Sequence, residues 1–137
     1  MKTNKKKITK GRLLITNGDY ILVLQKLDGK LSIPGGVVKK SESMILGLLR
    51  EVKEETNLDL QSENISFLGV KINYKKHHTI YKYYYATSNV CKDKVNNNED
   101  FKFKSLQWRL WLDTIDHLDA EDRASVLKYY SLKMPIN

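Results

Sequence analysis

Segment 42–56 constrains the fold of this chain most, because it joins the pattern of a packed helix to a concentration of acidic residues. Its apolar residues recur at i, i+3, i+4 and i+7, the spacing of a helix with one side on a core. These residues are Ile45, Leu48, Leu49 and Val52. Glu51, Glu54 and Glu55 are spaced at i, i+3 and i+4, so their carboxylates project from one side of the helix. The segment therefore predicts a core-packed helix with a separate acidic sector.

Stability alone gives no reason for three neighbouring carboxylates. Like charges one turn apart destabilise a bare helix by roughly 0.2–0.5 kcal/mol per pair, whereas a hard divalent cation makes the arrangement favourable. A solvated acidic face also explains the charges, but it does not explain Gly47, since mid-helix glycine costs about 1 kcal/mol relative to alanine. That glycine indicates a close approach to the helix backbone. Ser41 is the expected N-cap with Glu42 in the first turn, and Asn57 is the expected left-handed residue after the helix.

Residues 36–58 resemble the Nudix box, Gly-x5-Glu-x7-Arg-Glu-U-x-Glu-Glu-x-Gly-U, in which U is a bulky aliphatic residue. The matching residues are Gly36, Glu42, Arg50, Glu51, Val52, Glu54, Glu55 and Leu58. The penultimate glycine is replaced by Asn57, the usual second choice for a left-handed helix end. Segment 33–36, Ile-Pro-Gly-Gly, resembles the family's entry to the box, although the aromatic often found before it is Leu31 here. The resemblance implies an α/β fold, the Nudix-like α/β/α sandwich with a mixed β-sheet and the box helix packed on it.

The same resemblance implies a metal site with Mg²⁺, for which Mn²⁺ can substitute. Its implied ligands are the carbonyl of Gly35 and the side chains of Glu51, Glu54 and Glu55. Glu42 and Arg50 are the implied supports, with Arg50 orienting a neighbouring carboxylate. Family members differ in which carboxylate is the general base, and some take it from a later loop, where Glu99 is the first choice here and Asp100 the second. The expected catalytic residues are thus Glu54, Glu51, Arg50 and Glu99.

The rest of the chain reads as strands and one further helix. With 137 residues it can bury one sizeable core, and we expect a single Nudix hydrolase domain over residues 1–137. Strands are predicted at 7–16 and 20–26 around the turn Asn17-Gly18-Asp19, and then at 31–33, 65–72 and 79–87. Residues 90–100 read as a polar loop and 101–111 as mostly extended. The predicted second helix, 120–130, has its apolar side on Ala124, Val126, Leu127 and Tyr130.

The formal net charge of +8 suggests a nucleic-acid partner, but lysines are spread along the sequence and compositional bias explains the charge better. A basic surface would still attract a polyanionic nucleotide. Lys39 in the box loop and Lys76 in the cluster 75–78 are the expected phosphate contacts. The alternative is that both are ordinary solvated surface charges. Tyr81, Tyr83 and Tyr85 occupy alternate positions, so they lie on one face of a strand. We expect them to form core and sheet surface; the alternative is a stacking surface for a nucleobase. The expected substrate-binding residues are Lys39, Tyr83 and Lys76.

No apolar run is long enough to span a membrane, and the basic N-terminus is not followed by an apolar segment of the signal-peptide type. Cys91 is the sole cysteine and cannot form an internal disulfide. We therefore expect a cytoplasmic protein with no membrane partner, and the sequence leaves its oligomeric state open.

These features together predict Mg²⁺-dependent hydrolysis of a pyrophosphate bond in a nucleoside diphosphate linked to another moiety. One alternative is a pyrophosphohydrolase of dinucleoside polyphosphates or RNA 5′ ends, suggested by the basic charge. Another is a non-catalytic Nudix module that senses a nucleotide. Such lineages typically lose box glutamates, whereas Glu51, Glu54 and Glu55 are all present here.

Overall fold

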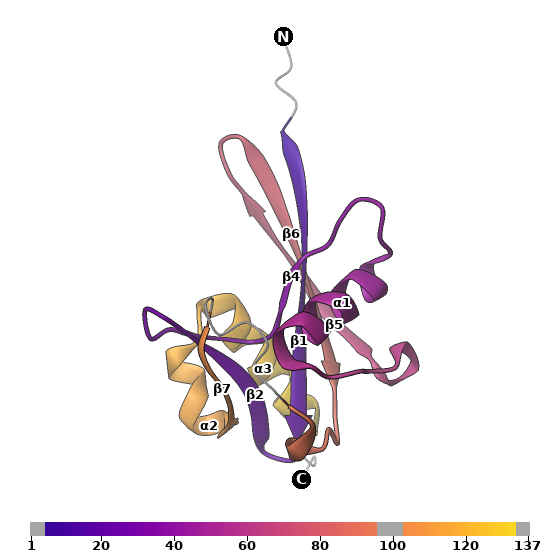
Figure 1. Ribbon diagram of the computed structural model, residues 1–137. Coiled ribbons are helices and arrows are strands. Elements are labelled where there is room, and N and C mark those ends of the chain that lie inside the picture. The colour runs from indigo at the N-terminus through magenta and orange to yellow at the C-terminus, as the bar shows by residue number, and fades with distance from the viewer. Residues whose placement is uncertain (1–4, 96–102, 134–137) are drawn as a thin grey trace.

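The computed structural model describes residues 5–95 and 103–133 (Figure 1). Glu99 and Asp100, the expected loop bases, lie outside the described residues. The strands are β1 (Lys6–Asn17), β2 (Tyr20–Lys26), β3 (Leu31–Ser32), β4 (Gly35–Val37), β5 (Ser66–Tyr74), β6 (His78–Thr87) and β7 (Phe103–Leu110). The helices are α1 (Met44–Thr56), α2 (Trp111–Thr114) and α3 (Ala120–Lys133), with short 3-10 turns η1 (Ser62–Asn64), η2 (Lys92–Lys94) and η3 (Ile115–His117).

Strand β1 organises the sheet because its two halves have different neighbours. Towards its N-terminus it pairs with β4 in antiparallel register, from Lys10↔Val37 to Arg12↔Gly35, and with β6 in parallel register. At its C-terminal end it pairs with β2 through the hairpin predicted from the sequence, in which Gly18 has φ 59°. The strand order is β3-β2-β1-β6-β5, with β4 on β1 and β7 on β2, so the seven-stranded sheet is mixed.

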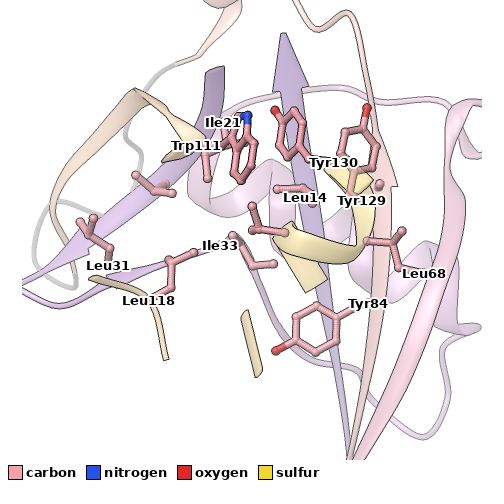
Figure 2. Packing of buried hydrophobic residues seen from close by; sticks show 13 residues of the cluster. Leu14, Ile21, Leu31, Ile33, Leu68, Tyr84, Trp111, Leu118, Tyr129 and Tyr130 are labelled. Carbon is pink, nitrogen blue, oxygen red and sulfur yellow. The ribbon is translucent and has the colours of Figure 1, made fainter. Parts of the chain in front are cut away.

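Two apolar clusters lie on opposite faces of this sheet. The α3 side contains Leu14 and Tyr84 together with Trp111, Tyr129 and Tyr130 (Figure 2). The α1 side contains Leu13 and Ile15 from the same strand, packed with Leu48 and Val52 of the helix. Consecutive residues of β1 are therefore buried on alternate sides, as strand geometry requires. This arrangement is the predicted α/β/α sandwich.

Helix α1 begins two residues later than expected. Ser43, rather than Ser41, is the N-cap, and its side chain accepts a hydrogen bond from the Leu46 amide. Glu42 therefore precedes the helix and does not lie in its first turn. The C-terminal prediction is confirmed, because Asn57 has φ 65° and its amide bonds the Lys53 carbonyl.

The apolar side predicted for helix α3 is confirmed in part, because Val126 and Tyr130 are buried. Ala124 and Leu127 are exposed. The buried residues are Asp122, Ser125, Val126, Tyr129 and Tyr130. The polar members of this side have partners that the sequence pattern does not reveal: for example, Asp122 accepts a hydrogen bond from Tyr84 Oη at 2.5 Å.

Among the residues described, the structure has no helix with the length and apolar character needed to cross a membrane.

Candidate metal and phosphate site

The glycine pair brings β4 against β1 and the end of α1. Gly35 has φ 146°, and a Cβ built on it would lie 1.9 Å from the Gly11 carbonyl oxygen, so only glycine fits there. The Gly35 amide donates a 2.8 Å hydrogen bond to Oε1 of Glu55, whose side chain is buried. The glycine expected to supply a metal-binding carbonyl thus also fixes one of the expected ligands.

Gly36 makes room for the second carboxylate. A Cβ at this position would lie 2.5 Å from Oε2 of Glu51, so the carboxylate packs directly on the glycine backbone. The Glu51 side chain is only 14% exposed, whereas that of Glu54, one turn further along, is 47% exposed. The three glutamates therefore range from buried to open along one side of α1.

Arg50 compensates the charge of this side. Its Nε and Nη2 bond both oxygens of Glu42 at 2.6 and 2.9 Å, and its Nη1 lies 3.2 Å from Glu51 and 3.1 Å from Glu54. The hydrogen bonds from Arg50 lower the pKa of Glu42 to about 2, and the Lys39 amide adds to the effect. The bonds to Glu42 also raise the pKa of Arg50 above its usual value. These contacts match the supporting roles expected for Glu42 and Arg50.

Gly47 lies at the contact between α1 and the loop 38–43. A Cβ there would meet Val38 Cγ1 at 2.7 Å and Glu42 Oε1 at 3.1 Å. The close approach predicted from this mid-helix glycine is therefore confirmed, and it is made by the protein's own loop. Glu42 is held from two directions, since the Lys39 amide bonds the same Oε1 at 2.9 Å.

The donor set has the chemistry that Mg²⁺ or Mn²⁺ requires, oxygen ligands with high negative charge. Glu51 and Glu54 both reach one nitrogen of Arg50, so a single positive charge already lies within reach of both. Within residues 5–95 and 103–133, no three His, Cys, Asp or Glu side chains stand in metal-binding geometry. The described contacts give the reason: Arg50 occupies Glu51 and Glu54, while Glu55 turns to the Gly35 amide.

A cleft of about 290 Å³ opens beside Glu51 and Glu55. Glu51, Glu55 and the glycine pair line this cleft, and so do Lys10, Arg12 and Lys26. Burial and the neighbouring Arg12, Lys82 and Lys26 lower the pKa of Lys10. Sequence reasoning missed these three cations. The sequence shows that Lys10 and Arg12 lie on the same face of a strand. Their position beside the glutamates, however, depends on the pairing of β1 with the three-residue strand β4.

Helix α3 anchors the chain that enters the glycine pair. Asp122 is buried, accepts the Tyr84 hydroxyl on Oδ1 and accepts the Ile33 amide on Oδ2 at 3.3 Å. Burial raises the pKa of Asp122, against the hydrogen bond from Tyr84. A residue outside the box therefore holds the segment two residues before Gly35.

The expected substrate-binding residues are divided between two places. Lys39 and Tyr83 both line a hollow of about 270 Å³ between the loop 38–43 and the sheet. Lys76 lies in the turn between β5 and β6, beyond the pair Lys6↔His78. Lys10 in the cleft lies four residue steps along β1 from that pair, roughly 13 Å of strand, and Lys76 does not line the cleft. A larger hollow, about 790 Å³, adjoins Asn57 and residues 87–91 and contains none of the three glutamates.

Comparison with known proteins gives these features a family. The model of the NUDIX domain matches residues 9–130. The chain belongs to this family. The expectation of a Nudix hydrolase is therefore confirmed at the level of the family.

A local sequence match links this NUDIX domain to an RNA-decapping enzyme. A segment of 46 residues is 44% identical to the U8 snoRNA-decapping enzyme of Homalodisca vitripennis, covering 34% of this chain and 25% of that protein. The chain thus aligns with about a quarter of that relative's length.

Solved structures share the fold at low sequence identity. The NUDIX domain of Shewanella oneidensis NrtR, complexed with ADP ribose, matches with a TM-score of 0.80 and 14% identity, covering 96% of this chain and 91% of that one. An Ap4A hydrolase of C. elegans, solved as a binary complex, matches with a TM-score of 0.73 and 20% identity, covering 92% of this chain and 97% of that one.

Proposed function

We propose that this protein hydrolyses a pyrophosphate bond in a nucleoside diphosphate linked to another moiety, with Mg²⁺ as cofactor and Mn²⁺ as a substitute. The observation that carries the proposal is the cleft lined both by Glu51 and Glu55 and by Lys10, Arg12 and Lys26. The carboxylates can hold cations, and the cationic side chains can hold phosphate oxygens. A cleft with both kinds of group suits a short polyphosphate chain, whose negative oxygens otherwise repel an attacking water.

Each residue of the cleft or of the neighbouring ion pairs then has a role that its contacts support. Glu51, Glu54 and Glu55 hold the divalent cation together with the Gly35 carbonyl, and Arg50 orients the first two. When bound, the cation supplies charge neutralisation at the phosphate oxygens and acidifies water. Glu54 is the most open of the three, so it is the helix carboxylate best placed to accept a proton from water. Lys10 and Arg12 bind and orient the phosphates.

The test is a substrate panel with purified protein. Nucleotide sugars, ADP-ribose, dinucleoside polyphosphates, nucleoside triphosphates and 5′-triphosphate RNA are each incubated with Mg²⁺ and with excess chelator. We expect metal-dependent cleavage of a nucleoside diphosphate derivative with kcat/KM of about 10⁴ M⁻¹s⁻¹ or more. Reaction in ¹⁸O-labelled water identifies the phosphorus attacked. Absence of any cleavage, or equal cleavage in chelator, would contradict the proposal and favour a binding module.

A second candidate is pyrophosphate hydrolysis at an RNA 5′ end. It is favoured by the local match to a snoRNA-decapping enzyme, which is a property of that relative and only suggests a substrate here. The two candidates separate within the same panel, since the second requires 5′-triphosphate RNA to be cleaved faster than every small nucleotide.

A further inference from the structure

Lysines are spread along the sequence, but acidic residues are not. Segments 1–18 and 64–92 contain eleven of the 24 Lys and Arg residues and none of the 16 Asp and Glu residues. The fold brings them together, because β1 pairs with β6 along ten residues and β6 pairs with β5. Most of the described part of both segments therefore forms a three-stranded ribbon, β1-β6-β5, with no acidic residue in any strand.

The ribbon projects from the rest of the molecule. In Figure 1 the β5–β6 hairpin and the start of β1 extend beyond the helices, and the loop before α1 lies near their base. Strand β5 ends the strand order. A basic surface of this shape is accessible to a large partner.

One face of the ribbon is aromatic. Residues directly opposite on paired strands point to the same side, and the pairs Phe67↔Tyr85, Val70↔Tyr83 and Ile72↔Tyr81 join such residues. Phe67 is 57% exposed and packs on Tyr85 with ring centroids 5.4 Å apart. Tyr74, at the end of β5, is 74% exposed. Exposed rings on a sheet offer flat surfaces on which unpaired bases can stack.

Lysines border the same face. Lys7 Nζ lies 4.5 Å from the centre of the Tyr81 ring. Lys7, Lys39 and Lys40 line the hollow of about 270 Å³ that also contains Tyr83. The one carboxylate in that hollow, Glu42, is neutralised by Arg50 at 2.6 Å. Glu121, which pairs with Lys82 at 2.8 Å, belongs to α3 on the other face of the sheet.

We propose that the aromatic face of the β1-β6-β5 ribbon, bordered by Lys7, Lys39 and Lys40, binds single-stranded nucleic acid. The lysines contact phosphates, and exposed rings such as Phe67 stack on bases. This binding uses neither the proposed metal ligands nor Lys10, Arg12 and Lys26 of the cleft, so it does not rest on the proposed hydrolysis. It applies to nucleic acid of any 5′ end.

A second copy of the chain is the competing occupant, because an exposed edge strand can pair with another. Charge argues against it: two such faces would bring two acid-free basic ribbons together, whereas a polyanion complements them. A duplex is also disfavoured, because its stacked bases leave no faces for the rings.

The test is fluorescence anisotropy with a labelled 12-nucleotide RNA bearing a 5′-hydroxyl, in excess chelator. This probe has no phosphoanhydride, so it cannot report on hydrolysis. We expect saturable binding that is at least tenfold tighter for the single strand than for its duplex. Phe67→Leu, which keeps apolar area without the ring, should weaken binding by about tenfold, and Phe67→Tyr should change it less than twofold.

Charge is tested with matched double variants. Lys7→Glu with Lys40→Glu should weaken binding more than tenfold and flatten the plot of log affinity against log salt by about 1.4, roughly 0.7 per phosphate contact. Lys30→Glu with Lys94→Glu makes the same change of net charge at exposed positions away from the face, and should weaken binding less than threefold. Circular dichroism confirms folding of each variant.

Three results would overturn the inference: no binding of the RNA, equal binding of single strand and duplex, or equal losses in the two double variants. Light scattering that shows a dimer disrupted by Phe67→Leu, with no RNA bound, would assign the face to a second copy instead.

Discussion

Arg50 contacts three carboxylates at once, and this contact explains how the acidic side of α1 remains folded. Glu42, Glu51 and Glu54 each lie within 3.2 Å of a guanidinium nitrogen. The pairs with Glu51 and Glu54 compensate charge that a divalent cation would also compensate. The proposed cation ligands and the arginine that compensates their charge are therefore neighbours, and single substitutions can separate their effects.

Replacement of Glu54 distinguishes catalysis from binding. Glu54→Gln keeps the volume and helical propensity but removes one negative charge. If the helix is catalytic, kcat should fall by roughly two or more orders of magnitude, about 3 kcal/mol of transition-state stabilisation, while substrate affinity changes far less. Glu63→Gln, on an exposed 3-10 turn, is the matched control. Turnover by Glu54→Gln at the wild-type rate would mean that the helix binds without catalysing.

Gly36→Ala should affect the metal more than the fold. The added Cβ would meet the Glu51 carboxylate at 2.5 Å, and that group is the flexible end of a side chain. We expect the free energy of unfolding to change by about 1 kcal/mol or less, and Mn²⁺ affinity, measured by electron paramagnetic resonance, to weaken by about tenfold or more. Unchanged Mn²⁺ affinity would argue against Glu51 as a ligand.

The pKa of Glu42 predicts a specific loss of stability in acid. Because Arg50 lowers this pKa in the folded state to about 2, from 4.5, the pair stabilises the protein above pH 4.5. That contribution should decline as pH falls from 4.5 towards 2. The difference in Tm between wild type and Glu42→Gln should therefore be constant above about pH 5.5 and shrink below pH 4.5. A difference that stays constant down to pH 2 would contradict the ion pair.

At the scale of elements, helix α1 was predictable from local sequence and its surroundings were not. The apolar period fixed its packed side, and Asn57 fixed its end. Ser41 and Ser43 are both good N-caps, and the choice depends on where Val38 and Glu42 pack against Gly47. Strand β4 has three residues, two of them glycine, so only its pairing with β1 reveals it as a strand.

Gly47→Ala tests the contact between α1 and its preceding loop. Helical propensity alone would stabilise the protein by about 1 kcal/mol. However, the new methyl group would meet Val38 at 2.7 Å in a packed site. Overpacking of this kind typically costs 1–3 kcal/mol, so we expect a net loss in urea unfolding. Leu46→Ala, at an exposed helix position, should change stability by about 0.5 kcal/mol or less. If Gly47→Ala stabilises the protein instead, the loop 38–43 moves to accommodate the methyl group.

At the scale of the whole molecule, the sequence predicted the acidic residues of the cleft and not its basic residues. The glutamates lie within one helix, where spacing determines direction. Lys10, Arg12 and Lys26 come from two strands, and they meet the glutamates only through pairings between distant segments. The basic ribbon was missed for the same reason, since the parallel register of β1 on β6 joins segments about 70 residues apart. A motif identifies functional residues that are close in the sequence, whereas strand pairing determines which distant residues lie beside them.

Metal binding should be linked to the stability of the whole domain, because the cation binds the folded state and the glutamates repel one another without it. At a concentration ten times its Kd, Mg²⁺ or Mn²⁺ should add about 1.4 kcal/mol, roughly 5 °C in Tm, and excess chelator should abolish the gain. Differential scanning fluorimetry across a metal titration measures the effect. The double variant Glu51→Gln with Glu54→Gln should show no such gain, and its metal-free Tm should change little, because relief of the repulsion is offset by the loss of two ion pairs with Arg50. Calcium should raise Tm while supporting little turnover, because its looser coordination positions water less well. A gain of the same size in the double variant would place the stabilising cation elsewhere on the molecule, and the metal site on this helix would have to be abandoned.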